Sequence, residues 1–350
     1  DAHRKLPDPA RYRGMFGGDL KIHDAAGLSA SDPVKRRRMA KSLEEATRAA
    51  GDAKKIVSVT GICSESLNEG AMATSNGMVG ALRSTSFARV AVASVRDRGS
   101  RKPTGWWYTA SPTISGLAPA EAIGREAYRR ATLQVGAKPR KSGQYPCIIE
   151  NATAGRLFGW LMRPMWGNAI QQQRSFLADK LGQAVAAPVL TMVDDPHLAG
   201  GYGSCRYDGE GMAAKKRVVI EKGVLRSFYL DTYYASKLGK TPTSGSKTNL
   251  VFSTGQRDLN GLLKAMGTGV LITGFSGGNS NPATGDFSIG IRGLWIEDGR
   301  PSNPVSEMNV AGNHLTFWKQ LQELGNDPWT SSAQRIPSLR FAKVQFSGMD

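Results

Sequence analysis

The sequence predicts an α+β fold, with a mixed α/β domain at residues 1–140 and a β-rich C-terminal domain at residues 141–350. First, 350 residues correspond to about two domains of ordinary size. Second, the two longest helical patterns fall in the first 140 residues, whereas apolar runs between turn residues fill most of the rest. Third, the 41 glycines favour turns and strands over long helices.

Two helices are predicted in the N-terminal domain. The first covers residues 31–51, because Asp32 can accept hydrogen bonds from the free N–H groups of the first turn and Pro33 suits the first helical position. Gly51 is expected to end this helix in the left-handed conformation. The second helix is expected to begin near Pro119 and to stop at Gly136.

The segment between these helices is expected to form strands. Residues 68–70 (Asn-Glu-Gly) and 75–77 (Ser-Asn-Gly) are typical of turns, so we expect the strands to be interrupted at both places. Alternating apolar residues at 87–95 and the aromatic run at 105–110 each indicate a strand. Residues 137–147 contain two prolines and no periodicity, and this predicts a linker at the domain boundary.

The C-terminal domain is expected to consist of strands and turns with a helix near each end. Residues 154–165 predict a helix that Pro164 ends. A hairpin is predicted with its turn at Lys222 and Gly223. Residues 283–301 predict a turn, a strand with a bulge at Gly293, and a second turn at 297–299.

The closing helix is predicted from the spacing of apolar residues over 311–325. The residues that repeat at helical spacing are Leu315, Trp318, Leu321 and Leu324.

The formal net charge of +17 would attract nucleic acid, an anionic membrane or an acidic partner. The basic residues are spread along the chain and are not interleaved with aromatics as in an RNA-binding sheet. A solvated basic surface, or one that faces an acidic protein, is therefore favoured over nucleic-acid binding. No apolar run approaches the length of a membrane span.

Three well-separated cysteines argue against a disulfide framework and favour a reducing, cytoplasmic compartment. The first residues include neither a Met nor an apolar signal core, so we expect a further N-terminal segment.

Local patterns for catalysis are weak. The four histidines (His3, His23, His197 and His314) are too far apart for a local zinc motif. Residues 193–211 contain Ser204 and Cys205 together with His197 and aspartates, but a glycine-rich stretch of this kind is more typical of turns than of a nucleophilic site. Residues 266–274 resemble a truncated phosphate loop that precedes a strand instead of following one.

Four stretches of the C-terminal half occur in a recognisable order. They are VDDPHLAGGYGS from Val193, YDGEGMAAKKRVVIEKGVLRSFYLDTYYASKLG from Tyr207, TGDFSIGIRGLWIEDGRPSNPVSEMNVAGN from Thr284, and GND from Gly325. In this order they resemble the TldD/PmbA family, formerly called modulators of gyrase. The match begins near Gly143, and a looser one in the first 140 residues includes DLKIHD (Asp19–Asp24).

The resemblance implies a cytosolic bacterial or archaeal protease made of two related subunits, and a C-terminal domain of the TldD/PmbA type. In this family the TldD-type subunit carries zinc on an H-E-x-x-x-H helix with a later cysteine. The PmbA type, also called TldE, lacks those ligands and pairs with the active subunit.

Counting back from Val193 places the zinc helix on FGWLMR. The histidine positions then become Phe158 and Arg163, and the glutamate position becomes Gly159. The residues after GND, at 328–335, include no cysteine. None of these side chains can hold zinc or activate water. The resemblance therefore implies a PmbA/TldE-type subunit with no cofactor of its own and with zinc in a TldD-like partner.

Three functions remain open. The first is a non-catalytic subunit of a heterodimeric zinc protease that helps bind unfolded peptides by strand addition. The second is a DNA- or polyanion-binding regulator, suggested by the charge of +17. The third is a metal-independent enzyme that uses Ser204, Cys205 or Asp286.

Candidate contacts with a channel or a partner subunit lie near the C-terminal motif. They are Asp286, Ser288, Glu307 and His314.

Overall fold

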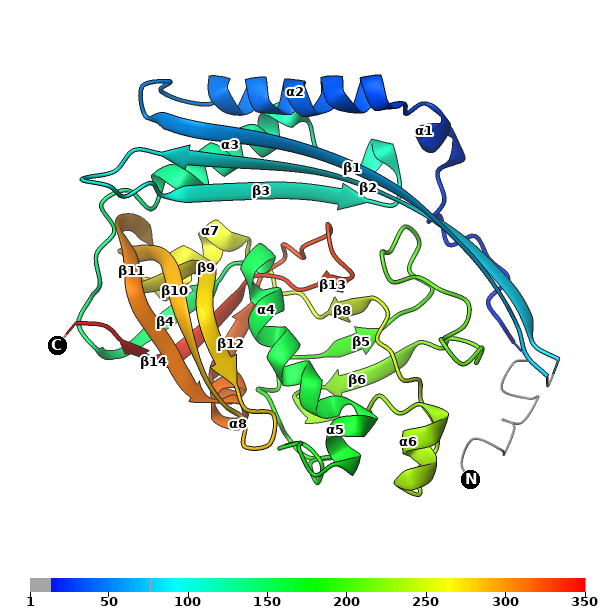
Figure 1. The fold of residues 1–350 in the computed structure, drawn as a ribbon. Coiled ribbons are helices and arrows are strands. Elements are labelled where there is room, and N and C mark those ends of the chain that lie inside the picture. The colour runs from blue at the N-terminus through cyan, green and yellow to red at the C-terminus, as the bar shows by residue number, and fades with distance from the viewer. Residues whose placement is uncertain (1–13, 76, 350) are drawn as a thin grey trace.

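The computed structural model describes residues 14–75 and 77–349, so His3 lies outside the described part of the chain. It has an N-terminal unit, in which helices pack on a three-stranded sheet, above a larger C-terminal unit with two sheets and a central helix (Figure 1). The elements of the N-terminal unit are α1 (Ala25–Ser29), α2 (Pro33–Ala49), β1 (Ile56–Ala73), β2 (Val79–Val95), β3 (Thr104–Ser111), η2 (Ile114–Gly116) and α3 (Ala120–Thr132). This arrangement confirms the predicted α+β class.

Helix α2 begins as predicted, because the Asp32 side chain accepts a hydrogen bond from the N–H of Lys35 and Pro33 occupies the first turn. The prediction for Gly51 is wrong, since this glycine does not adopt a positive φ. Its role is steric instead. A Cβ at Gly51 would lie 2.0 Å from the ring of Tyr128, so glycine lets that ring pack against the end of the helix.

The predicted turn at residues 68–70 is also wrong. These residues continue β1 and pair with Leu82, Arg83 and Ser84 of β2. The long antiparallel ladder, with an ion pair of 2.7 Å between Glu69 and Arg83, outweighs the local turn preference. The chain reverses at the second predicted position instead, where Gly77 has a φ of 88°.

The first sheet of the C-terminal unit has six strands and is mixed. In spatial order they are β11 (Arg300–Asn313), β10 (Asp286–Glu297), β9 (Gly269–Ser280), β4 (Gly143–Ile149), β14 (Leu339–Ser347) and β12 (Leu321–Leu324). Strand β4 takes up the second half of the predicted linker. Pro146 is tolerated there because it lies at a register shift between β4 and β14, where a missing N–H costs little.

The second sheet has five short strands. They are β13 (Gln334–Arg335), β8 (Leu250–Phe252), β5 (Met192–Asp194), β6 (Arg217–Glu221) and β7 (Val224–Leu225). The helices of this unit are α4 (Asn151–Met162), α5 (Gly167–Gln171), α6 (Thr232–Lys237), α7 (Leu259–Met266) and α8 (His314–Phe317), with the 3₁₀ turns η3 (Arg163–Met165) and η4 (Trp318–Gln320). Helix α4 lies between the two sheets and packs into one hydrophobic core with both (Figure 1).

Local turn chemistry is confirmed at three places in this unit. Lys222 and Gly223 both have positive φ at the hairpin between β6 and β7, and Asp298 and Gly299 do the same between β10 and β11. The register shifts at Gly293, as predicted, and a Cβ there would lie 2.0 Å from the carbonyl oxygen of Leu271.

The predicted closing helix is largely wrong. Helix α8 and η4 end at Gln320, and the next four residues form β12. Leu321 and Leu324 are both buried, although they are three residues apart, because β12 shifts register against β14 between Leu321 and Glu323. A bulged strand thus reproduces the apolar spacing of a helix. Within the described part of the chain, no helix is both long and apolar enough to cross a membrane.

Candidate functional site

Helix α4 carries the positions that the family resemblance assigns to zinc ligands. Its inner face is buried at helical spacing, and Pro164 ends it through the turn η3. The buried residues are Ala154, Leu157, Phe158, Leu161 and Met162. The opposite face carries Arg156 and Gly159, and Arg163 follows them as the first residue of η3; all three retain exposure to solvent.

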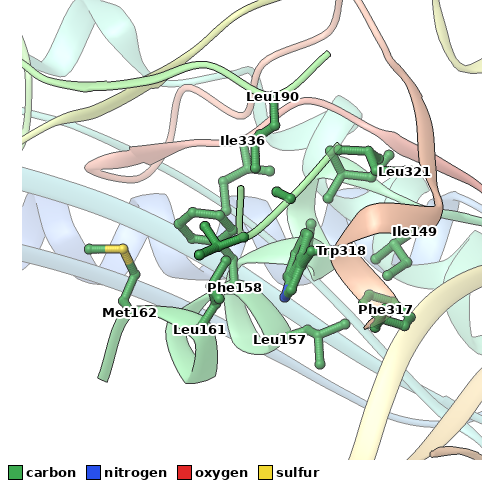
Figure 2. Close-up of a cluster of buried hydrophobic side chains, with 14 of the residues drawn as sticks. Ile149, Leu157, Phe158, Leu161, Met162, Leu190, Phe317, Trp318, Leu321 and Ile336 are labelled. Atoms are coloured by element: carbon green, nitrogen blue, oxygen red, sulfur yellow. The ribbon is translucent and has the colours of Figure 1, made fainter. Parts of the chain in front are cut away.

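Phe158 lies in a closed aromatic cluster. Its side chain is fully buried, and its ring meets those of Phe252 and Trp318 edge-on, with centroids 4.9 Å and 5.5 Å away. Figure 2 shows Phe158 among other apolar side chains of the cluster, including Leu190 and Ile336. Apolar contacts therefore occupy this position.

Gly159 and Arg163 do not complete a metal site with Phe158. A Cβ at Gly159 would meet nothing within 4 Å. Arg163 is exposed and lines an open pocket of about 490 Å³ with Tyr229 and Asp231. Phe158 and Arg163 thus face different environments, and a guanidinium repels a cation.

The rest of the described chain adds no metal donors to this place. Residues 328–335 include no cysteine. Over residues 14–75 and 77–349, no three His, Cys, Asp or Glu side chains gather in a way that could hold a metal ion. The residue types on α4 do not fit zinc.

Asp286 stabilises the turn that starts β10. Its carboxylate accepts hydrogen bonds from the Thr284 hydroxyl at 2.7 Å and from the Asn313 amide at 2.9 Å. These two bonds lower the pKa of Asp286. Ser288 lines a shallow hollow on the outer face of the same sheet, whereas Glu307 is exposed in β11 near another register shift. The three side chains do not form a cluster.

His314 is a core residue and offers no surface to a channel or a partner in this structure. Its ring is fully buried, stacked between Phe176 and Phe287. The indole N–H of Trp318 donates to Nδ1 at 3.1 Å, so the neutral ring carries its proton on Nε2, which lies 3.1 Å from the Ser280 hydroxyl. Burial lowers the pKa of His314 to about 4.

Residues 193–211 do not assemble a nucleophilic site. The hydroxyl of Ser204 donates to the carbonyl of Leu198 at 2.5 Å and accepts from the Asn249 amide at 2.9 Å. His197 stacks on Phe16 with centroids 4.3 Å apart. Burial raises the pKa of Cys205 to about 11, which disfavours a thiolate. These side chains stabilise a turn through hydrogen bonds and packing.

A second pocket, which the sequence does not reveal, lies where the two units meet. This junction pocket has a volume of about 280 Å³ and is lined by residues of β3, α3, α4, β9 and β10. Three arginines, Arg130, Arg156 and Arg292, line it together with Trp106 and Trp107. Residues from five elements meet only in the folded chain, so no local motif marks the site.

The outer edge of β3 runs along this pocket. Val95 donates its N–H to the Pro103 carbonyl, so antiparallel alternation turns the N–H and C=O groups of Trp106 and Tyr108 away from β2. The Thr104 carbonyl, which points the same way, accepts a bond from the Gln134 amide. Among the residues described, no main-chain or side-chain group bonds to the outward groups of Trp106 and Tyr108. The strand therefore keeps an open edge.

Comparison with known proteins fits this architecture. Residues 25–135 match the model of the PmbA/TldA metallopeptidase central domain, and residues 142–348 match that of the C-terminal domain. The fold is thus that of a two-domain protein of the metallopeptidase class, with α4 lacking metal donors. The chain belongs to the PmbA/TldD family, which confirms the resemblance seen in its motifs.

The curated relatives are longer than this chain. It is 32% identical over 243 residues to metalloprotease PmbA of Escherichia coli O157:H7, covering 69% of this chain and 54% of that protein. It is 28% identical over 300 residues to the PmbA homologue of Buchnera aphidicola subsp. Baizongia pistaciae, covering 85% and 67%. The chain therefore spans about half to two thirds of the length of these relatives.

Solved structures share the fold along nearly the whole chain. A Bacteroides thetaiotaomicron protein described as a candidate modulator of DNA gyrase superposes with a TM-score of 0.95 at 39% identity, over 100% of this chain and 79% of that one. TldE from Thermococcus kodakarensis superposes with a TM-score of 0.83 at 22% identity, over 96% and 80%. The second likeness concerns the fold alone.

Proposed function

We propose that this chain is the non-catalytic subunit of a two-subunit zinc metalloprotease, paired with a TldD-like subunit that holds the zinc. The observation that carries this proposal is the burial of Phe158 among aromatic rings, at a position where the family resemblance puts a zinc-ligating histidine. Arg163 at the second such position adds a positive charge that opposes metal binding. The family membership supplies the protease context.

In this proposal the chain helps to hold unfolded peptides for the catalytic subunit. The open edge of β3 supports this role, because an extended peptide can add to such an edge through main-chain hydrogen bonds alone. The complex would work in the cytoplasm. Three free cysteines, Cys63, Cys147 and Cys205, are in keeping with a reducing compartment.

Purification with and without a TldD-like subunit tests the proposal. The chain purified alone is expected to contain no stoichiometric zinc by elemental analysis and to leave an unfolded peptide intact. Co-expression should yield a complex that contains zinc and cleaves the same peptide. Tight zinc and peptidase activity in the chain alone would show that the proposal is wrong.

A second candidate function is binding of DNA or another polyanion. It is favoured by the net charge of +17 and by the exposed basic residues Lys35, Arg37, Arg38 and Lys41 of α2. Such binding must weaken steeply with salt, because phosphate contacts release counterions. The double variant Arg37→Glu/Arg38→Glu should then abolish binding at low salt, with Arg226→Glu, directly after β7 of the second sheet, as a control. Absence of DNA affinity in the unmodified chain at low salt would exclude this function.

A further inference from the structure

We propose that the junction pocket binds a carboxylate of an extended peptide, with Arg292 and Arg156 as the cationic groups and Trp106 as the apolar wall. The inference rests on the proposed peptide-binding role of this chain and adds the chemical feature that would be recognised. The carboxylate belongs either to the C-terminus of the peptide or to an acidic side chain.

Arg292 is the central group, because its charge has no counter-ion among the described residues. Its Nε atom is buried without a hydrogen-bond partner, and Nη2 makes only a long contact of 3.4 Å with the Phe275 carbonyl. The guanidinium lies over Gly274, where a Cβ would be 3.5 Å from Nε, at ordinary van der Waals distance. A planar carboxylate can pair with a guanidinium through two parallel bonds.

Arg130 and Arg156 differ in whether their guanidinium groups are free to bind a ligand. Arg130 is saturated, since it bonds to Glu126 at 2.8 Å, to Glu150 at 2.5 Å and to the Thr273 carbonyl at 3.1 Å. Arg130 therefore forms part of the pocket wall, where its guanidinium lies 4.0 Å above the ring of Trp107. Arg156 is exposed, and within the described part of the chain its side chain bonds only to the Gly277 carbonyl, so it can turn towards a ligand. Neither Arg156 nor Arg292 forms an ion pair with any described residue.

The surroundings favour a peptide over a free anion. The pocket is lined by Trp106, which is 50% exposed, and by the open edge of β3, so a strand paired with β3 would pass the two arginines. At about 280 Å³ the pocket is slightly smaller than the range of about 300–1,000 Å³ for small-ligand sites, which suits one end or one side chain of a peptide. Aromatic walls hold the apolar part while the arginines fix the charge.

Equilibrium binding of labelled peptides to the lone chain tests the proposal by fluorescence anisotropy. One unstructured sequence is made in four forms: C-terminal carboxylate or amide, each with an internal Gln or Glu. The forms with a carboxylate should bind about tenfold more tightly than the amidated Gln form, the loss expected for a charge-assisted bond. A gain from the free C-terminus alone identifies that source, and a gain from Glu alone identifies the side chain. Equal affinity of all four forms overturns the proposal.

Variants locate the binding. Arg292→Met and Arg156→Met should each weaken the carboxylate forms about tenfold and leave the amidated Gln form unchanged. Arg163→Met, just beyond the C-terminal end of α4, is the matched control and should behave like the unmodified chain. If Arg292→Met does not fold, as judged by circular dichroism, the affinity of Arg156→Met for the carboxylate forms decides the test. Carboxylate preference that survives in every folded variant, or competition by inorganic phosphate without any peptide preference, contradicts the proposal.

The result is separable from the proposed non-catalytic role. Binding is measured without a partner subunit and with metal chelated, so zinc content and cleavage do not enter it. A chain that prefers carboxylates but also binds zinc and cleaves peptides would refute only the non-catalytic role. A zinc-free, inactive chain without carboxylate preference would refute only the assignment of the junction pocket.

Discussion

The inner and outer faces of helix α4 differ in burial and in the kind of side chain that they carry. On the inner face, Phe158 and its apolar neighbours are sealed from water between the two sheets. On the outer face, Arg156 and Arg163 keep their charges in solvent and each lines a pocket. Both faces include positions at which the family resemblance places zinc ligands, yet the residues found there are of opposite character.

Burial explains this difference. A lone histidine facing a core of aromatic rings would leave a polar group without a partner, which costs free energy, so an apolar ring is the stable occupant once no metal is held. No such constraint applies to a position in solvent, where a cation is tolerated. The inner face should therefore respond to mutation through stability, and the outer face through binding.

The largest effect is expected from Phe158→Ala. Removing the ring leaves a cavity against Phe252 and Trp318 and should lower the free energy of unfolding by about 3–5 kcal/mol. Urea denaturation followed by tryptophan fluorescence measures this. Phe158→Leu serves as the control and should cost less, because most of the apolar volume remains. A loss below about 1 kcal/mol for Phe158→Ala would mean that the inner face is not packed as described.

A pH dependence of stability should arise from His314, beside the same core. Its pKa is about 4 in the folded protein against an ordinary value of 6.5, so the unfolded chain binds more protons between these values. The contribution of neutral His314 to the free energy of unfolding is therefore complete above pH 6.5. As the pH falls from 6.5 towards 4, the free energy of unfolding decreases by about 3 kcal/mol.

Comparison with His314→Gln isolates this term. Other titrating groups, such as Glu150, whose pKa burial raises, are common to both proteins and cancel in the difference. Denaturation at several pH values should give a steeper fall for the unmodified chain than for the variant. Parallel curves would show that His314 titrates as it does in water.

The sequence predicted the elements that depend on local chemistry. The cap at Asp32 and the hairpin turns at Lys222 and Asp298 follow from the conformational needs of single residues, which neighbours in space do not alter. Prediction failed where distant pairing decided the outcome. Pairing with β2 keeps residues 68–70 in a strand. A register shift in β12 gives its buried leucines the spacing that is expected of a helix.

The same distinction holds for the candidate site. The motifs indicated which α4 positions lack metal donors, but not that Phe158 turns inward while Arg163 turns to solvent. That Arg292 and Trp106 line the same junction pocket depends on how the two units meet, and no spacing in the sequence encodes it.

A smaller effect is expected from Asn313→Ala, at the surface side of the His314 cluster. The Asn313 amide bonds to the Thr284 carbonyl and to Asp286, and its oxygen caps α8 at the N–H of Leu315. Loss of this cap should cost about 1 kcal/mol, since water replaces part of the bonding at an exposed site. Thermal unfolding checks the size, with Ser302→Ala on an exposed part of β11 as the control. A cost as large as that of Phe158→Ala would remove the contrast between buried and exposed positions.

The smallest effect on stability is expected from Arg163→Ala. The side chain is exposed at the end of α4 and, among the described residues, forms no ion pair or side-chain hydrogen bond. Its truncation should change the free energy of unfolding by no more than about 0.5 kcal/mol, because water solvates the same surface in both proteins. Urea denaturation beside Phe158→Ala makes the comparison within one helix. A cost above about 1.5 kcal/mol would mean that the arginine stem packs against the pocket wall, so that the outer face of α4 also contributes to the core.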